Sequence, residues 1–159
     1  MYRNSFIACI LTLACFIILI PNDGSAQSDK VKTAMAALKA DTEKLGAPKV
    51  EGNDLYFGKT KASNEMVDAV VKKHGGAATL FVKKGKEYVR VATTVKTESG
   101  KNAVGSALDA NSSAIGMLDN GEPYYGDAKV FGKSYDAGYE PIKDASGSVI
   151  GAYFVGQPK

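Results

Sequence analysis

The main change in the spacing of apolar residues along the chain comes at Gly75-Gly76, and this change limits the fold more than any other feature. Before the glycine pair, apolar residues recur every three or four positions over 28–45 and 63–74, which predicts two helices. After it, apolar and polar residues alternate, which is typical of strands. Helices followed by a mostly antiparallel sheet define an α+β fold.

Both predicted helices carry signals at their ends. Ser28 and Ser63 suit the first capping position, while Gly46 and Gly75 follow the last turns. The first helix has a mainly apolar stripe, formed by Val31, Met35, Leu38, Thr42 and Leu45. Such a stripe predicts an amphipathic helix with one buried face.

Strands are predicted through most of the remaining chain. DLYFGKTK, ATLFV, EYVRVATTV and SVIGAYFVG each fit one strand, and 126–143 fits one long strand or two short strands with a glycine bend. A short helix is predicted over 111–118. The run SVIGAYFVG is mostly apolar, so we expect burial on both faces and a central place in the sheet.

The first 26 residues have the layout of a secretory signal peptide. Arg3 precedes an apolar run over 6–20, and small residues lead to Ala26. This layout predicts cleavage after Ala26 and a periplasmic or secreted chain of residues 27–159. An uncleaved anchor and lipid attachment at Cys15 are the alternatives, although the run is shorter than the roughly 20 apolar residues of a membrane span.

Both cysteines, Cys9 and Cys15, lie inside the predicted signal segment. Residues 27–159 therefore have no disulfide, thiolate metal site or thiol nucleophile, and burial alone must stabilise their fold. The single histidine, His74, has no His or Cys companion for a metal site, and we interpret it as a partner of the helix C-terminus. The length of 27–159 predicts one domain.

Composition and motifs argue against several classes of function. The formal net charge is +3, but the lysines are scattered and do not form the basic face of a nucleic-acid binding protein. The sequence lacks a G-x-S-x-G nucleophile motif and a phosphate-binding glycine loop, and no carboxylate pair has a spacing that suggests acid–base work. We expect no nucleic-acid partner, enzyme activity, cofactor or metal.

Arg90 is the one arginine after the signal segment, and it lies in the middle of a predicted strand. Strict alternation predicts one core face, formed by Val89, Val91, Thr93 and Val95. It predicts a second face, formed by Tyr88, Arg90, Ala92 and Thr94. A guanidinium group there suits a carboxylate, because its planar fork donates two parallel hydrogen bonds. A solvent-facing or salt-bridged arginine is the alternative.

Tyrosines are concentrated just before the last strand. They are Tyr124, Tyr125, Tyr135 and Tyr139. Phenol rings supply apolar walls with an orienting hydroxyl, as ligand pockets often require. The alternative interpretation is that aromatic residues simply favour strands.

The second half also contains the blocks ATLFVKKGKEYVRVATTV, GKNAVGSAL and GEPYYGDAKVFGKSYDAGYEPIKDASGSVIGAYFVG. In this order they resemble the single-Cache extracellular sensor domains, in particular the Cache 3/Cache 2 type of methyl-accepting chemotaxis receptors and sensor kinases. The resemblance covers about residues 53–156. It implies a PAS-like fold in which a long N-terminal helix packs on an antiparallel sheet of about five or six strands. It also implies a pocket for a small organic acid on the other face.

The resemblance implies a set of ligand-binding residues, namely Arg90, Thr93, Thr94, Lys129, Tyr135, Tyr139 and Lys143. In the implied roles, Arg90 holds a carboxylate and the two tyrosines wall the pocket. Lys129 or Lys143 supplies a second charge. Two segments depart from the family pattern. This chain has Asn102-Ala103-Val104-Gly105-Ser106 where relatives often read Arg-Ala-Val-Gly-Thr, and Ser112-Ser113-Ala114-Ile115 where they often read His-Pro-Ala-Tyr.

Relatives normally continue from the last strand into a transmembrane helix and an output module, whereas this sequence ends at Lys159. We therefore expect a stand-alone sensor domain that binds a small carboxylate and acts with a membrane receptor or sensor kinase. The alternative is an interaction module without a ligand, which docks on a membrane receptor or forms a homodimer through the helix at 28–45.

Overall fold

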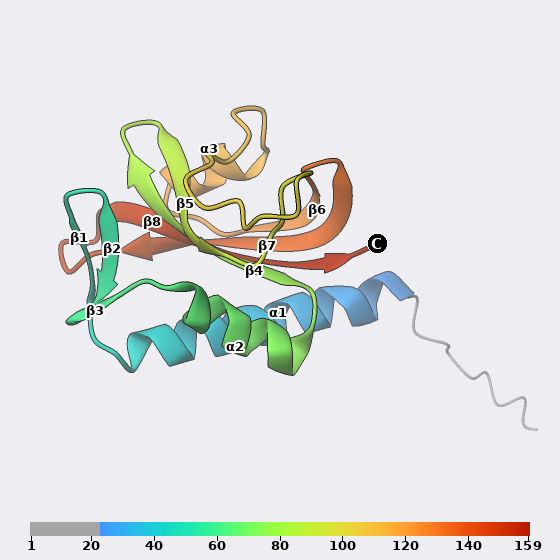
Figure 1. Cartoon of the computed structure of the whole chain (residues 1–159), viewed down its shortest axis with the longest axis horizontal. Coiled ribbons are helices and arrows are strands. Elements are labelled where there is room, and N and C mark those ends of the chain that lie inside the picture. Colours follow the sequence, from blue (N-terminus) through green and yellow to red (C-terminus); the bar gives the residue numbers. More distant parts are fainter. Residues whose placement is uncertain (1–22) are drawn as a thin grey trace, which may run out of the picture.

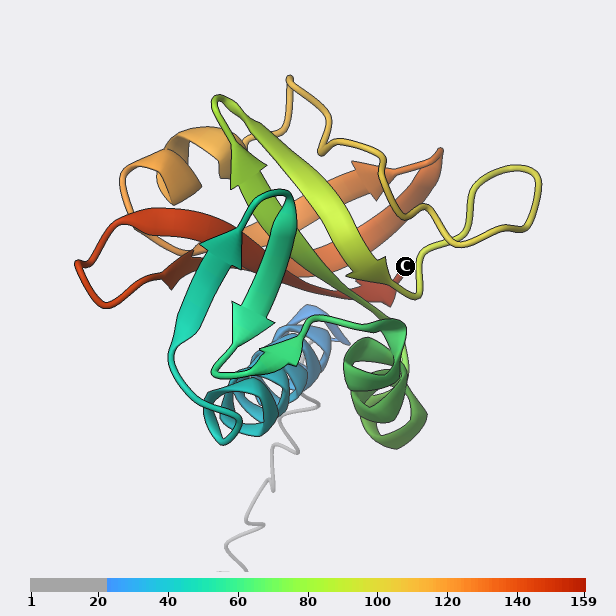
Figure 2. The same ribbon diagram turned by 60° about the vertical axis from the view of Figure 1, so that its left-hand side comes forward.

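The computed structural model describes residues 23–159, with side chains from residue 28 on, and it confirms the α+β fold. Helices α1 (Asp23–Glu43) and α2 (Asn64–His74) lie side by side against one face of a large sheet (Figure 1). The short helix α3 (Ala114–Asp119) lies on the other side of that sheet (Figure 2). The sheet therefore has one face that carries the long helices and one that a short helix and loops cover.

The large sheet has five antiparallel strands in the order β5-β4-β8-β7-β6. The strands are β4 (Ala77–Lys84), β5 (Glu87–Thr93), β6 (Tyr124–Val130), β7 (Lys133–Lys143) and β8 (Val149–Pro158). The segment 126–143 thus belongs to two strands, with a turn between them. β8 lies in the middle of the sheet, as its apolar sequence predicts. It is also buried on both faces, since Tyr153 packs on the helix side and Phe154 on the opposite side.

A smaller sheet has the order β1-β2-β3, formed by β1 (Pro48–Glu51), β2 (Asp54–Phe57) and β3 (Thr60–Lys61). The sequence predicts only one strand here, over 54–61. The turn after Phe57 divides this segment into β2 and β3, and the unpredicted β1 pairs with β2. Leu55 and Phe57 of β2 are buried in the core on the helix side, which attaches the small sheet to the domain.

Helix α1 differs from its prediction at both ends. It begins at Asp23 rather than at residue 28, and it ends at Glu43, so Leu45 lies beyond the helix and is 41% exposed. The other four stripe residues are buried. Most of the predicted signal segment lies outside the described residues, and its cleavage stays a prediction. Within residues 23–159, no helix has both the length and the apolar character that crossing a bilayer requires.

Helix α2 agrees closely with its predicted range. Ser63 occupies the first capping position, but its hydroxyl does not make the capping hydrogen bond that the sequence suggests. Lys72 and Lys73 in the last turn complement the negative end of the helix dipole, and Gly75 terminates the helix at φ 74°.

A β-bulge in β5 overturns the predicted faces of that strand. Leu80 of β4 pairs with Ala92 and Phe81 pairs with Arg90, so Val91 is an extra residue. One extra residue reverses the alternation beyond it. Ala92 therefore packs on the helix side with Val89. Residues 93 and 95, which strict alternation assigns to the Val89 face, lie on the Arg90 side instead.

Candidate ligand-binding site

A cavity of about 350 Å³ opens on the side of the large sheet opposite α1 and α2. Strands β5, β6 and β7 contribute to it, together with the loop that precedes α3. The lining residues are Arg90, Ala107, Leu108, Asp109, Asn111, Ser112, Ser113, Asp127, Ala128, Lys129, Val130, Phe131 and Tyr139. The volume suits a small organic molecule.

Arg90 is held at this cavity by the segment that follows β5. Its amide donates to the Ser106 carbonyl at 2.9 Å, and its own carbonyl accepts from the Gly105 amide at 2.8 Å. Its Nη1 donates to the Ala107 carbonyl at 2.6 Å and to Ser106 Oγ at 3.0 Å. The backbone and one end of the guanidinium group are therefore fixed by the same short segment.

The remaining environment of the guanidinium group is aromatic. Its central carbon lies 5.1 Å from the ring centre of Phe81 and 5.3 Å from that of Phe131, which are cation–π distances. Arg90 is only 4% exposed, and its Nε has no hydrogen-bond partner within residues 23–159. None of the ion pairs formed by these residues includes Arg90. The cavity thus contains a buried cation that no carboxylate of residues 23–159 pairs with.

Burial lowers the pKa of Arg90 from its ordinary value, because the charged guanidinium group loses hydration. The group nevertheless stays protonated, since arginine starts from a very high pKa. A buried cation is costly unless an anion or further hydrogen bonds compensate it. The present contacts of Arg90 leave room for an anionic partner.

Tyr139 of β7 lines the same cavity from the middle of the aromatic core. Its ring centre lies 4.8 Å from that of Phe154 and 6.1 Å from that of Tyr124. Burial raises its pKa, so the hydroxyl stays protonated at neutral pH. That hydroxyl has no hydrogen bond to any described residue, which leaves a donor available beside Arg90.

Polar side chains form the outer part of the cavity. The loop before α3 provides Asp109, Asn111, Ser112 and Ser113, and β6 provides Asp127 and Lys129. Asp127 is already paired with Lys159. Lys129 is exposed, so its charge is hydrated and contributes less than that of Arg90.

The structure brings together three of the seven predicted ligand-binding residues, namely Arg90, Lys129 and Tyr139. Tyr135 lines a neighbouring cavity of about 300 Å³, which also contacts Lys129. Lys143 lies at the end of β7, close to Gly121, and lines neither cavity.

The two predicted threonines also lie outside both linings. Thr93 and Thr79 share a hydrogen bond at 2.7 Å, and Thr94 accepts one from the Ala78 amide at 3.0 Å. Their hydroxyls therefore serve the pairing of β4 with β5. No described group of three or more His, Cys, Asp or Glu side chains has an arrangement that could hold a metal ion.

Sequence reasoning did not identify Phe131 or the loop at 107–113 as parts of the site. Phe131 lies in the turn between β6 and β7, where the sequence predicts only a bend. The loop did carry a signal, because Ser112 and Ser113 belong to a segment that departs from the family pattern. Ser106, in the other departing segment, contacts Arg90 directly.

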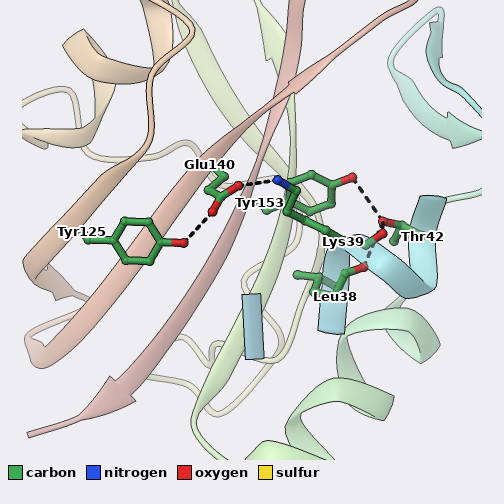
Figure 3. Close-up of polar contacts among 6 residues, drawn as sticks. All are labelled: Leu38, Lys39, Thr42, Tyr125, Glu140 and Tyr153. Carbon is green, nitrogen blue, oxygen red and sulfur yellow. Dashed lines mark hydrogen bonds and ion pairs between the residues drawn. The ribbon is translucent and has the colours of Figure 1, made fainter. Parts of the chain in front are cut away.

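The opposite face of β7 carries a polar network that joins the sheet to α1 (Figure 3). Glu140, the residue after Tyr139, accepts a hydrogen bond from Tyr125 at 2.5 Å and pairs with Lys39 of α1 at 2.6 Å. Nearby, Thr42 of α1 and Tyr153 of β8 share a hydrogen bond at 3.1 Å. Strand β7 therefore contacts the cavity through Tyr139 and α1 through Glu140.

Comparison with known proteins agrees with this arrangement. The Cache 3/Cache 2 fusion domain family matches residues 25–159, which include nearly all of α1, so the chain belongs to this family of sensor domains. The fold is similar to the crystal structure of the E. coli DcuS sensor domain, with a TM-score of 0.51 and 14% sequence identity. That similarity covers 83% of this chain and 88% of the DcuS chain. No curated protein matches the sequence.

Proposed function

We propose that this Cache sensor domain binds a small organic carboxylate and that Arg90 is its main anchor. The single observation that carries the proposal is the buried Arg90 side chain, which lines a cavity and has no carboxylate partner in residues 23–159. A ligand carboxylate would compensate this charge and accept hydrogen bonds from the guanidinium group. Tyr139 offers a further donor, and Lys129 adds a cation at the outer part of the cavity.

We also propose that the domain acts in the periplasm or outside the cell, with a membrane receptor or sensor kinase as its partner. Membership of a family of sensor domains supports this role. A ligand-free module that docks or dimerises through α1 is the alternative. Against it, the large apolar side chains of α1 are already buried in the protein's own core, so a partner would meet mainly polar residues and alanines.

A thermal-shift screen tests the proposal. The purified protein is heated with small mono- and dicarboxylates, and with amines and sugars as controls. A ligand present at one hundred times its dissociation constant stabilises a protein by about 2.7 kcal/mol, which raises the midpoint by a few degrees. We expect such a shift from carboxylates and none from the amines or sugars.

The Arg90→Lys variant tests the anchor, because lysine keeps the charge but loses the planar fork. We expect the shift from the best carboxylate to disappear or to need at least tenfold more ligand. Lys143→Gln is the matched control, since Lys143 lies outside the cavity, and it should retain the shift. An unchanged affinity in Arg90→Lys would contradict the assignment.

A further inference from the structure

Phe131 has a backbone conformation that a phenylalanine rarely adopts. Its φ is 46°, the one positive value among the non-glycine residues of 23–159. Val130 pairs with Lys133, so Phe131 and Gly132 form a two-residue hairpin turn, and both have positive φ. Such type I′ turns strongly favour Asn, Asp or Gly at the first central position. Turn geometry therefore does not explain a phenylalanine here.

Burial in the core does not explain Phe131 either. The residue is 42% exposed, whereas Phe57, Phe81 and Phe154 are buried. Its ring instead lies beside the guanidinium group of Arg90 and lines the cavity. A strained conformation that presents an aromatic ring to a buried cation indicates a role at the site.

The charges around the cavity indicate how many carboxylates a ligand can carry there. Arg90 is the buried cation, and Asp127 is paired with Lys159. Asp109 also lines the cavity and forms no ion pair with any described residue; its Oδ1 accepts a hydrogen bond from the Asn111 amide at 2.9 Å. A second carboxylate on a ligand held by Arg90 would meet Asp109 and Lys129, which are both exposed and of opposite charge, so the lining offers it no net positive charge.

We propose that Phe131 is a specificity-determining residue, which packs against the hydrocarbon part of a monocarboxylate held by Arg90 and disfavours dicarboxylates of similar length. The proposal rests on the proposed function and adds the ligand class and the residue that selects it. Ala128 and Val130, which line the same cavity, extend the apolar wall beside the ring. The ring also shields Arg90 from water, which strengthens its interaction with a single anion.

Phe131→Asn gives a sharp test, because asparagine suits the turn but lacks the ring. The probes are butyrate and succinate, which have the same number of carbons and differ in charge. For the unaltered full chain, titration calorimetry should show butyrate binding at least tenfold more tightly than succinate. The variant should unfold at the same temperature as the parent protein or above it, yet lose at least tenfold in butyrate affinity. Leu45→Asn, at an exposed apolar position outside the cavity, is the matched control and should keep the affinity.

A second experiment measures how well Phe131 shields Arg90 from solvent, and it needs no ligand. Phenylglyoxal modifies arginine, and mass spectrometry of the peptide that contains Arg90 measures its rate of modification. The rate should rise severalfold in Phe131→Asn and stay unchanged in Leu45→Asn and in Phe131→Tyr, which retains an aromatic ring. Equal rates in Phe131→Asn and the parent protein, or succinate binding more tightly than butyrate, would overturn the inference. If Phe131→Asn retains butyrate affinity while Arg90→Lys loses it, the inference fails and the proposed function stands.

Discussion

The ammonium group of Lys39 lies 2.6 Å from Glu140 Oε2 and joins helix α1 to strand β7. Glu140 also accepts the hydroxyl hydrogen of Tyr125, so one carboxylate satisfies two neighbouring donors. We expect Glu140→Ala to lower the free energy of unfolding by about 2 kcal/mol, because both donors lose their partner in a partly buried site. Chemical denaturation measures this loss. Asp41→Ala, which breaks the exposed pair with Lys44, should change it by less than about 1 kcal/mol.

Ser106 is predicted to affect both stability and binding through Arg90. Its Oγ accepts a hydrogen bond from Arg90 Nη1 at 3.0 Å, and the Ala107 carbonyl is the other close acceptor. Ser106→Ala should lower the free energy of unfolding by about 1 kcal/mol and weaken carboxylate binding, because one anchor of the guanidinium group is lost. Ser106→Thr keeps the hydroxyl and should preserve both properties. Denaturation and calorimetry on the two variants test this prediction, and equal affinities in both would contradict it.

Ionisation of Tyr153 should lower the free energy of unfolding at alkaline pH. Burial raises its pKa to about 12, from about 10 in an unfolded chain. The folded protein therefore holds this proton more tightly. The resulting stabilisation is complete below about pH 10 and is lost as the pH rises toward 12. Tyr153→Phe should be about 1 kcal/mol less stable at pH 8, where it lacks the hydrogen bond to Thr42.

The free energies of unfolding of the parent protein and of Tyr153→Phe should then converge as the pH rises above 10. Denaturant unfolding at several values between pH 8 and pH 11.5 measures both slopes. A parallel decline of the two curves would contradict the assignment to Tyr153. Tyr125 and Tyr139 also have raised pKa values, so the variant should retain some alkaline sensitivity.

Gly151 is predicted to tolerate no side chain. A Cβ atom there would lie 2.2 Å from the Phe81 carbonyl oxygen, where the central strands β4 and β8 pair. Gly151→Ala should therefore lower the free energy of unfolding by about 2–3 kcal/mol, because the two strands must separate locally. Gly116→Ala in α3 is the control. Its Cβ meets nothing within 4 Å, and it should be neutral or slightly stabilising. Thermal unfolding of both variants decides this prediction.

Much of the fold could be predicted because it depends on local patterns. The apolar run of β8 predicts its central position, and the period and end signals of α2 predict that helix closely. The bulge at Val91 could not be predicted, because the extra residue is visible only in the pairing of β5 with β4. For that reason Thr93, which strict alternation assigns to the Val89 face, in fact lies on the Arg90 side.

The candidate site could be predicted only in part. Arg90 was identifiable as a single arginine in the middle of a strand, and the structure indeed places it at a cavity. Phe131 could not be identified from the sequence, because its proximity to Arg90 depends on where the turn between β6 and β7 lies relative to β5. Family resemblance also suggested Lys143, which the length of β7 carries beyond the cavity.

The segment that holds Arg90 also affects how copies of the domain can associate. The outer edge of β5 is occupied, because Ser106, Gly105 and Leu108 make backbone hydrogen bonds to it and the Asn64 side chain accepts from the Thr93 amide. Within residues 23–159, no strand pairs with the outer edge of β6. Only one edge of the large sheet can therefore accept an added strand. Association through that edge would stop at a closed pair of molecules, because the second edge needed to continue a fibre is already filled.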